Sequence, residues 1–269
     1  MNCFARPQLS KNSTTIKVDI RMNNIILADK LVGAEICDWL FKNYPKDIGL
    51  VAVLRDNEIK RAANAADIPC ILFSTETELL KYVENTGMDY DWGFLLWWPQ
   101  IISSALIKLC RNGFINTHPS LLPHNRGKHY NFWALVEQAP FGVSLHLVKE
   151  GIDCGDIVAQ SSISYDWEDT GSSLYEKAIN AMPILFKETY PTLHNKDIKF
   201  KQQDLSKGSF HLAKELDLAS YIELDKNYCA RDLLNLVRAR TFVGQPACSF
   251  KDENGEEFEV RIEIRRKHK

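Results

Sequence analysis

The chain has 269 residues, of which 45% are hydrophobic, so it is long enough to bury a core as one large domain or as a large and a small one. Its formal net charge of -2 gives no overall attraction for nucleic acid or for an anionic membrane surface. Its seven cysteines form no CxxC pair, so we expect no metal site and no disulfide framework, with reduced thiols in a cytoplasmic protein.

Residues 1–21 are polar and hold no apolar run long enough for a secretory signal or a membrane span, and we predict a mobile leader there. Strand-like and helix-like segments alternate after Met22. The strands are expected at 24–28, 49–53, 70–73, 92–96 and 113–116, and the helices at 31–41, 58–66, 76–85 and 101–110. This alternation predicts an α/β, Rossmann-like fold: an open, mostly parallel sheet with helices on both faces.

The pattern becomes less regular in the second half of the chain. Strands are expected at 141–148 and 156–164, a long helix at 172–189, and a final β-hairpin that turns at Asn254-Gly255. We therefore divide the chain into the leader, a large domain over residues 22–200 and a smaller C-terminal α+β region over residues 201–269.

The segment INTHPSLLPHNRG, residues 115–127, follows an apolar strand directly. Ligands of open α/β sheets bind beyond the carboxyl ends of the strands, which is where Asn116 and His118 are predicted to lie. In an extended conformation two residues at this spacing project from the same side. A second polar position, Asp153, follows the strand that contains His146, so Asn, His and Asp side chains could converge from two loops. We interpret His146 itself as a core or supporting residue.

These blocks carry a family resemblance. INTHPSLLP, RG, FWAL, FGVSLH and GIDCGDIVAQ are similar in order and spacing to the formyltransferases that use 10-formyltetrahydrofolate, over roughly residues 24–189. The resemblance implies the formyltransferase variant of the Rossmann-like fold, with Asn116, His118 and Asp153 as catalytic residues. Ser144 departs from the pattern, since many members have threonine there.

Formyl transfer explains the residue types. An amine attacks the formyl carbon, and negative charge builds on the carbonyl oxygen, for which Asn116 and a protonated His118 are donors. The amine must also lose a proton, and His118 or a water held by Asp153 could accept it, which the sequence leaves open. A carboxylate beside an imidazole is expected to raise the pKa of the histidine, which favours the donor role.

The folate site is expected where the sequence DWGFLLWWPQIISS ends a strand, because paired tryptophans at that edge can wall an aromatic pocket. The resemblance implies walls at Trp98, Ile101, Ile102 and Phe114. It also implies that the backbone at Gly151 and Ile152, in the loop before Asp153, binds the pterin edge.

Two features bear on the amine that is formylated. Purine-pathway members have a glycine-rich turn after the first strand to hold a ribose phosphate, whereas this chain reads ADKLVGAE with the single Gly33. Members that act on initiator methionyl-tRNA append a basic domain. Residues 208–269 contain eleven Lys or Arg and eleven Asp or Glu, which is unfavourable for a polyanion.

The C-terminal sequence, with LNLVRARTF at its centre, instead resembles that of the sugar N-formyltransferases. We therefore expect formyl transfer to a dTDP-linked 4-amino or 3-amino sugar for cell-surface polysaccharide such as O-antigen, in a homodimer that binds neither nucleic acid nor membrane. The alternatives are a methionyl-tRNA formyltransferase and a non-catalytic nucleotide-binding protein of the same fold. Residues suited to a diphosphate and a base are Arg126, Lys128, Arg238 and Phe242.

Overall fold

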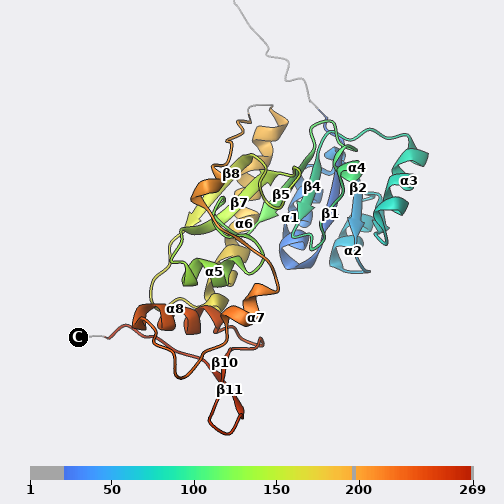
Figure 1. The fold of residues 1–269 in the computed structure, drawn as a ribbon. Helices are drawn as coiled ribbons and strands as arrows, with labels where there is room; N and C mark the ends of the chain where they lie inside the picture. Colours follow the sequence, from blue (N-terminus) through green and yellow to red (C-terminus); the bar gives the residue numbers. More distant parts are fainter. Residues whose placement is uncertain (1–20, 196–197, 268–269) are drawn as a thin grey trace, which may run out of the picture.

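The structure is a computed structural model that describes residues 21–195 and 198–267. A seven-stranded sheet forms its centre, in the order β3-β2-β1-β4-β5-β7-β8 (Figure 1). The strands are β1 (Asn24–Ala28), β2 (Ile48–Val53), β3 (Cys70–Leu72), β4 (Gly93–Leu96), β5 (Phe114–His118), β7 (Phe141–Leu147) and β8 (Ile157–Ile163). The first five are parallel, and β7 and β8 are antiparallel to their neighbours, which confirms the predicted mostly parallel sheet. Residues 1–20 of the leader predicted over residues 1–21 lie outside the described residues.

Helices cover both faces of the sheet. One apolar core lies between the sheet and the helices α1 (Lys30–Asn43), α2 (Glu58–Ala65), α5 (Tyr130–Val136) and α6 (Gly171–His194). A second core lies on the opposite face, under α3 (Glu76–Thr86) and α4 (Ser104–Ile107). Successive strand residues alternate between the two cores: Ile26 belongs to the first, and Ile25 and Leu27 belong to the second.

Three elements differ from the prediction: α6 runs on to His194, beyond the expected end at residue 189, and α4 and β5 also have other bounds. The helix expected over residues 101–110 is the short α4, whose start is capped by the Ser103 hydroxyl, which accepts from the Leu106 N–H. The helix ends at its C-cap Lys108, and Cys110 then forms a parallel bridge with Tyr90, just before β4 and β5 begin. The strand expected at 113–116 continues to His118, because residues 115–118 pair with residues 144–147 of β7.

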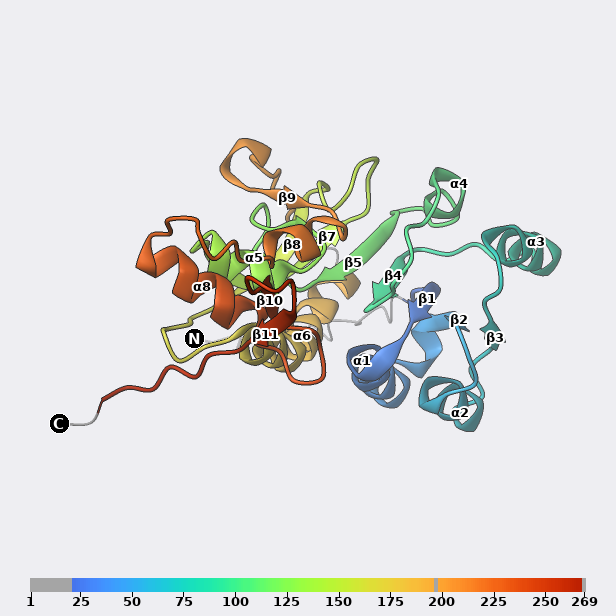
Figure 2. The same ribbon diagram turned by 60° about the horizontal axis from the view of Figure 1, so that its bottom comes forward.

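The C-terminal part packs at one end of the molecule, beside α5 (Figures 1 and 2). It contains β9 (Phe210–His211), α7 (Glu215–Ala219), α8 (Ala230–Arg240), β10 (Cys248–Lys251) and β11 (Glu257–Val260). The strands β10 and β11 form the predicted hairpin, and Gly255 in its turn has a φ of +81°. Strand β9 pairs instead with β6 (Arg126–Gly127), which belongs to the large domain. The chain that follows residue 200 thus packs back onto the large domain. The domain boundary at residue 200 stays a prediction.

Candidate active site

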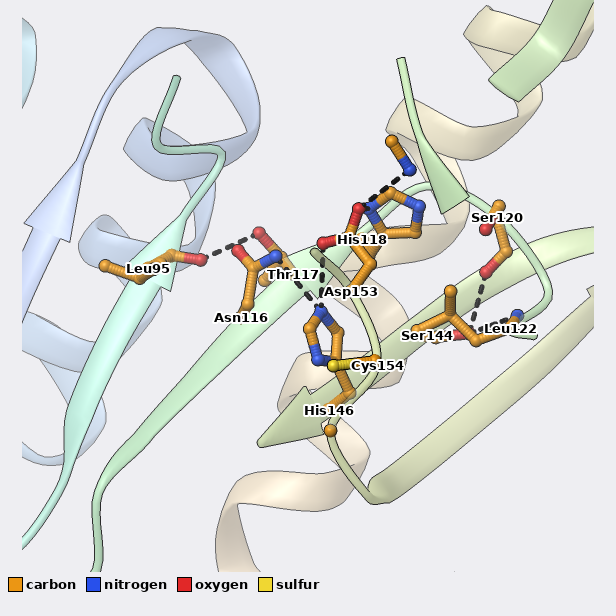
Figure 3. A network of polar contacts seen from close by, with 12 residues as sticks. Leu95, Asn116, Thr117, His118, Ser120, Leu122, Ser144, His146, Asp153 and Cys154 are labelled. Atoms are coloured by element: carbon orange, nitrogen blue, oxygen red, sulfur yellow. Dashed lines mark hydrogen bonds and ion pairs between the residues drawn. The ribbon is translucent and has the colours of Figure 1, made fainter. Parts of the chain in front are cut away.

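Strand β5 presents Asn116 and His118 on one side, opposite β7 (Figure 3). Asn116 pairs across the strands with His146, and His118 pairs with Ser144. The hydroxyl of Thr117, which points the other way, donates to the Leu95 carbonyl and accepts from the Trp97 N–H at 2.8 Å. The two candidate side chains are therefore held on a paired strand rather than on a free loop, which restricts their movement.

Asp153 approaches from the loop between β7 and β8 (Figure 3). Its Oδ2 lies 3.4 Å from Nδ1 of His118, and its Oδ1 lies 3.5 Å from Nε2 of His146. The backbone N–H of Gly127 donates to Oδ2 at 2.9 Å. The expected convergence of Asn116, His118 and Asp153 is thus present in the structure.

His146 is the member of this cluster that the sequence left as a core or supporting residue. Its ring is 6.0 Å from that of His118, and its Nε2 lies 3.1 Å from Nδ2 of Asn116. Its Nδ1 donates to the Leu147 carbonyl at 2.9 Å, and its Nε2 lies between the Asn116 amide and Oδ1 of Asp153. His146 therefore orients Asn116. The alternation of β7 placed the residue on the correct face, but only the pairing register brings it opposite Asn116.

The loop that follows β5 is anchored to the same neighbouring strand. The hydroxyl of Ser144 donates to the Ser120 carbonyl at 2.7 Å and accepts from the Leu122 N–H at 3.1 Å. Gln160 adds a bond to the Leu122 carbonyl at 2.8 Å. A serine at position 144 thus makes both bonds that fix the turn behind His118, and the departure from threonine leaves the site intact.

Burial dominates the protonation of His118. It lowers the pKa of the imidazole below its ordinary value and outweighs the Asp153 carboxylate, which acts in the opposite direction. The carboxylate does raise this pKa, as expected, but the larger effect of burial leaves the pKa of His118 below its ordinary value. Nδ1 of His118 lies 3.4 Å from Oδ2 of Asp153, and its Nε2 is buried without a hydrogen-bond partner among the described residues.

Asp153 remains ionised beside it. Burial opposes the charge, but His118, His146 and the Gly127 N–H together hold the pKa of Asp153 well below its usual range. The cluster thus combines a free imidazole nitrogen, a fixed carboxylate behind it and an oriented amide. That combination suits proton transfer from a nucleophile together with donation to an oxyanion.

The residues predicted to wall a folate pocket separate into two groups. Ile101 is 81% exposed, Ile152 is partly exposed, and Gly151 has a φ of +95°, so these loop positions are accessible to a ligand. Trp98, Ile102 and Phe114 are instead buried in the core under α3 and α4. Phe114 fails as an open wall because its ring fills the space above Gly93, where a Cβ would lie 2.3 Å from it. Trp98 keeps a buried Nε1–H without a partner among the described residues.

The residues predicted to hold the acceptor also differ from one another. Lys128 is exposed, and Arg126 is half-buried with an Nε that has no partner within the described part of the chain. Phe242 is half-buried, 5.5 Å from the ring of Tyr175. Tyr175 in turn lies 6.3 Å from Trp97, so these aromatic rings form a row that starts where β4 ends.

Arg238 does not fit the predicted ligand role. It is 4% exposed, and its guanidinium donates to the carbonyls of Asp166 and Asp169 and to the Asn235 side chain. Trp167 stacks on it at 4.7 Å. The position of Arg238 near a helix end predicts a ligand contact, but in the structure this arginine ties α8 to the loop before α6.

Replacing Arg238 with methionine is therefore expected to weaken the fold and leave ligand binding unchanged. The loss of charged hydrogen bonds to buried carbonyls should lower the free energy of unfolding by about 2 kcal/mol. Urea denaturation would measure that loss, with Arg231→Met as a matched control because Arg231 is exposed and lies 5.5 Å from the Trp167 ring. A large loss of nucleotide affinity at unchanged stability would contradict the structural role.

Two absences hold for the described residues. Residues 21–195 and 198–267 contain no group of three or more His, Cys, Asp or Glu placed to hold a metal ion. Within the same ranges no helix is both long and apolar enough to cross a membrane.

Comparisons with known proteins agree with this geometry. Residues 55–189 match the family model described as formyl transferase, and residues 215–266 match the N-formyltransferase dimerization C-terminal domain. The bifunctional polymyxin resistance protein ArnA of Wigglesworthia glossinidia brevipalpis is 30% identical over 188 residues, which are 69% of this chain and 28% of that protein. The chain thus spans less than a third of that curated relative.

Two solved structures show the same fold. A sugar N-formyltransferase from Shewanella sp. FDAARGOS_354 superposes with a TM-score of 0.73 at 20% identity, over 92% of this chain and 99% of that one. An N-formyltransferase from Helicobacter canadensis, in complex with folinic acid and dTDP-3-aminofucose, superposes with a TM-score of 0.65 at 18% identity, over 81% of this chain and 80% of that one. Since the formyl transferase model covers half of this sequence and includes Asn116, His118 and Asp153, the chain belongs to the formyl transferase family.

Proposed function

We propose that this protein transfers a formyl group from 10-formyltetrahydrofolate to the amino group of a nucleotide-linked amino-dideoxy sugar. The observation that carries the proposal is the cluster of Asn116, His118 and Asp153, which has the donor, base and charge that formyl transfer to an amine requires. The Helicobacter canadensis relative binds a folate and a dTDP-linked amino sugar, and this supports the substrate class.

The folate, when bound, supplies the formyl carbon as the electrophile and its N10 as the leaving group. The new bond joins that carbon to the sugar nitrogen. Nε2 of His118 accepts the proton that the amine loses and returns a proton to N10, so that protons balance. Asn116, oriented by His146, donates to the oxygen on which charge builds. Asp153 stabilises the imidazolium during the transfer.

The observations at the folate position fit a pterin. Ile101 and Ile152 offer apolar contact, and Trp98 offers a buried N–H donor without a partner in the described residues. The backbone of Gly151 and Ile152 lies in the same loop as Asp153, so a pterin bound to that backbone would have its polar edge near the reacting groups.

The choice of acceptor rests on three features: the segment that follows β1, a row of aromatic rings, and two basic residues in the loop after β5. Gly33 lies inside α1, where a Cβ would be 2.8 Å from the Leu96 carbonyl oxygen, so this glycine permits close packing of helix on sheet and forms no phosphate loop. The aromatic row of Trp97, Tyr175 and Phe242 offers stacking for a base or a sugar ring. Arg126 and Lys128 follow the catalytic loop and suit a diphosphate.

We further infer that the enzyme acts as a homodimer through residues 215–266, since that region matches a dimerization domain. Its product would be a formylated sugar for cell-surface polysaccharide, made in the cytoplasm.

Melting shifts distinguish the acceptors. A ligand that binds only the folded state raises the melting temperature by an amount that grows with its concentration relative to its dissociation constant. We expect a clear shift with dTDP or UDP at millimolar concentration and none with initiator tRNA at physiological salt. A strong tRNA shift that falls steeply with added salt, with no response to either nucleotide, would favour methionyl-tRNA as the acceptor. Nucleotide binding without formyl transfer from the folate to any amino sugar would indicate a non-catalytic protein.

A further inference from the structure

The segment that connects the two family matches lies against the catalytic loops. Lys201 bridges to Ile157 through a pair of backbone hydrogen bonds of 2.9 and 2.8 Å. Further along, β9 pairs with β6, which directly precedes Lys128, and His211 stacks on Trp133 at 3.7 Å. The segment therefore contacts the loop after β5 and the loop that carries Asp153. Its residues 190–214 belong to neither family match.

Gln203 is the side chain by which this segment reaches the Asp153 loop. It is 8% exposed, and its Nε2 donates to the carbonyls of Asp153 at 2.9 Å and Gly155 at 2.6 Å. Both partners are acceptors, so the amide nitrogen must face them. One buried side chain thus ties the backbone on both sides of Cys154.

The loop follows a backbone path that few other residue types could take. Asp153 has a φ of +52°, in the left-handed region that aspartate adopts more readily than most non-glycine residues. Gly155 follows so closely against β7 that a Cβ there would lie 1.7 Å from the Leu147 carbonyl oxygen. The direction of the Asp153 side chain therefore depends on how this backbone is held. The two bonds from Gln203 fix the carbonyl of the same residue whose carboxylate meets His118 and His146.

We propose that Gln203 is a positioning residue that holds the carboxylate of Asp153 against His118 and His146 for formyl transfer. The proposal rests on the function proposed above, because it assigns Gln203 a part in that reaction. Gln203 acts through Asp153 alone. Losing its two bonds lets the loop relax and moves the carboxylate away from the imidazoles.

The first test is kinetic. Gln203→Met keeps the length of the side chain and removes its donors, and a shift of about 1 Å in a catalytic group costs up to roughly a hundredfold in rate. We expect kcat to fall at least tenfold with little change in KM, and Gln203→Glu to be at least as impaired because its carboxylate faces two carbonyls. The matched control is Gln202→Met, since Gln202 is exposed and adjacent. In an Asp153→Asn background, Gln203→Met should cause no further loss, and additive losses would overturn the proposal.

The second test needs no substrate. The titratable groups that face His118 are Asp153, His146, Lys128 and Tyr130, beside the Asn125 backbone, and the Asp153 carboxylate is the charged group that raises the pKa of the imidazole. An NMR titration of ligand-free protein should therefore give His118 a lower pKa in Gln203→Met than in the wild type, with the fold checked by thermal melting. An unchanged His118 pKa together with kcat within twofold of wild type would overturn the proposal. A lowered pKa in a protein that formylates no amino sugar would refute the function and retain the positioning role.

Discussion

Replacing His118 with asparagine is expected to reduce formyl transfer by about a hundredfold or more, while folate affinity and melting temperature stay close to wild type. Asparagine retains a polar amide of similar size but cannot accept a proton near neutral pH. In the wild-type protein Nε2 of His118 is buried and unpartnered within the described residues, so the fold loses no hydrogen bond at that atom. The effect should therefore fall on kcat and kcat/KM together.

Initial rates with 10-formyltetrahydrofolate and an amino-sugar acceptor measure this loss. The matched control is His124→Asn, since His124 lies in the same loop and is half-buried, and burial and Glu137, rather than Asp153, shift the pKa of its imidazole. Turnover within about tenfold of wild type, a difference of only about 1.4 kcal/mol in the activation barrier, would show that His118 is not the catalytic base.

Because burial lowers the pKa of His118, the acidic limb of the wild-type kcat/KM profile should lie below the ordinary histidine value of about 6.5.

Replacing Asp153 with asparagine is the second change with a large expected effect. The carboxylate is ionised and faces both imidazoles, so its removal takes away the charge that stabilises protonated His118 during transfer. We expect kcat to fall by about a hundredfold, as for loss of a preorganised charged group near a reacting centre. The acidic limb should move to still lower pH, because the carboxylate raises the pKa of His118 and the variant lacks it.

The pH dependence of kcat/KM is the decisive measurement for Asp153. A profile in Asp153→Asn with the same acidic limb as the wild type would remove Asp153 from the proton pathway. Asp156→Asn serves as the control, since Asp156 ends the same loop but pairs with Lys149 at 2.7 Å.

The stability of Asp153→Asn should also respond differently to acid. In the wild type the depressed pKa of Asp153 stabilises the fold above a pH of about 4, and this contribution is lost as the pH falls further.

Sequence periodicity located the sheet strands and most helices because each buried strand and amphipathic helix has its own local pattern. The spacing of Asn116 and His118 likewise placed two side chains on one face of β5. The register between β5 and β7 lies beyond local pattern, so the contact of His146 with Asn116 required the structure. The same limit applies to Gln203, which is 50 residues from Asp153 in the chain.

The roles of charged and aromatic residues, as ligand contacts or as parts of the fold, were the hardest to predict from the sequence. Arg238 near a helix end has the same local sequence features as a ligand-binding arginine, and only its contacts with the Asp166 and Asp169 carbonyls show that the fold uses it. Phe114 shares the face of Asn116, but the glycine opposite it at position 93 lets its ring enter the core. Whether such residues meet a ligand depends on the packing of neighbouring elements, which no local pattern encodes.

The connecting segment limits how this protein could be recombined with its relatives. The two family matches, over residues 55–189 and 215–266, suggest that a chimera could combine the first region of this protein with the second region of a relative, joined at the end of α6. A junction there would exchange Gln203 and β9 for foreign residues, and the carbonyls of Asp153 and Gly155 would lose their donor. A junction placed after His211 would keep the native segment with the catalytic module. Chimeras of these two designs should therefore differ in activity even where both fold and bind the same nucleotide.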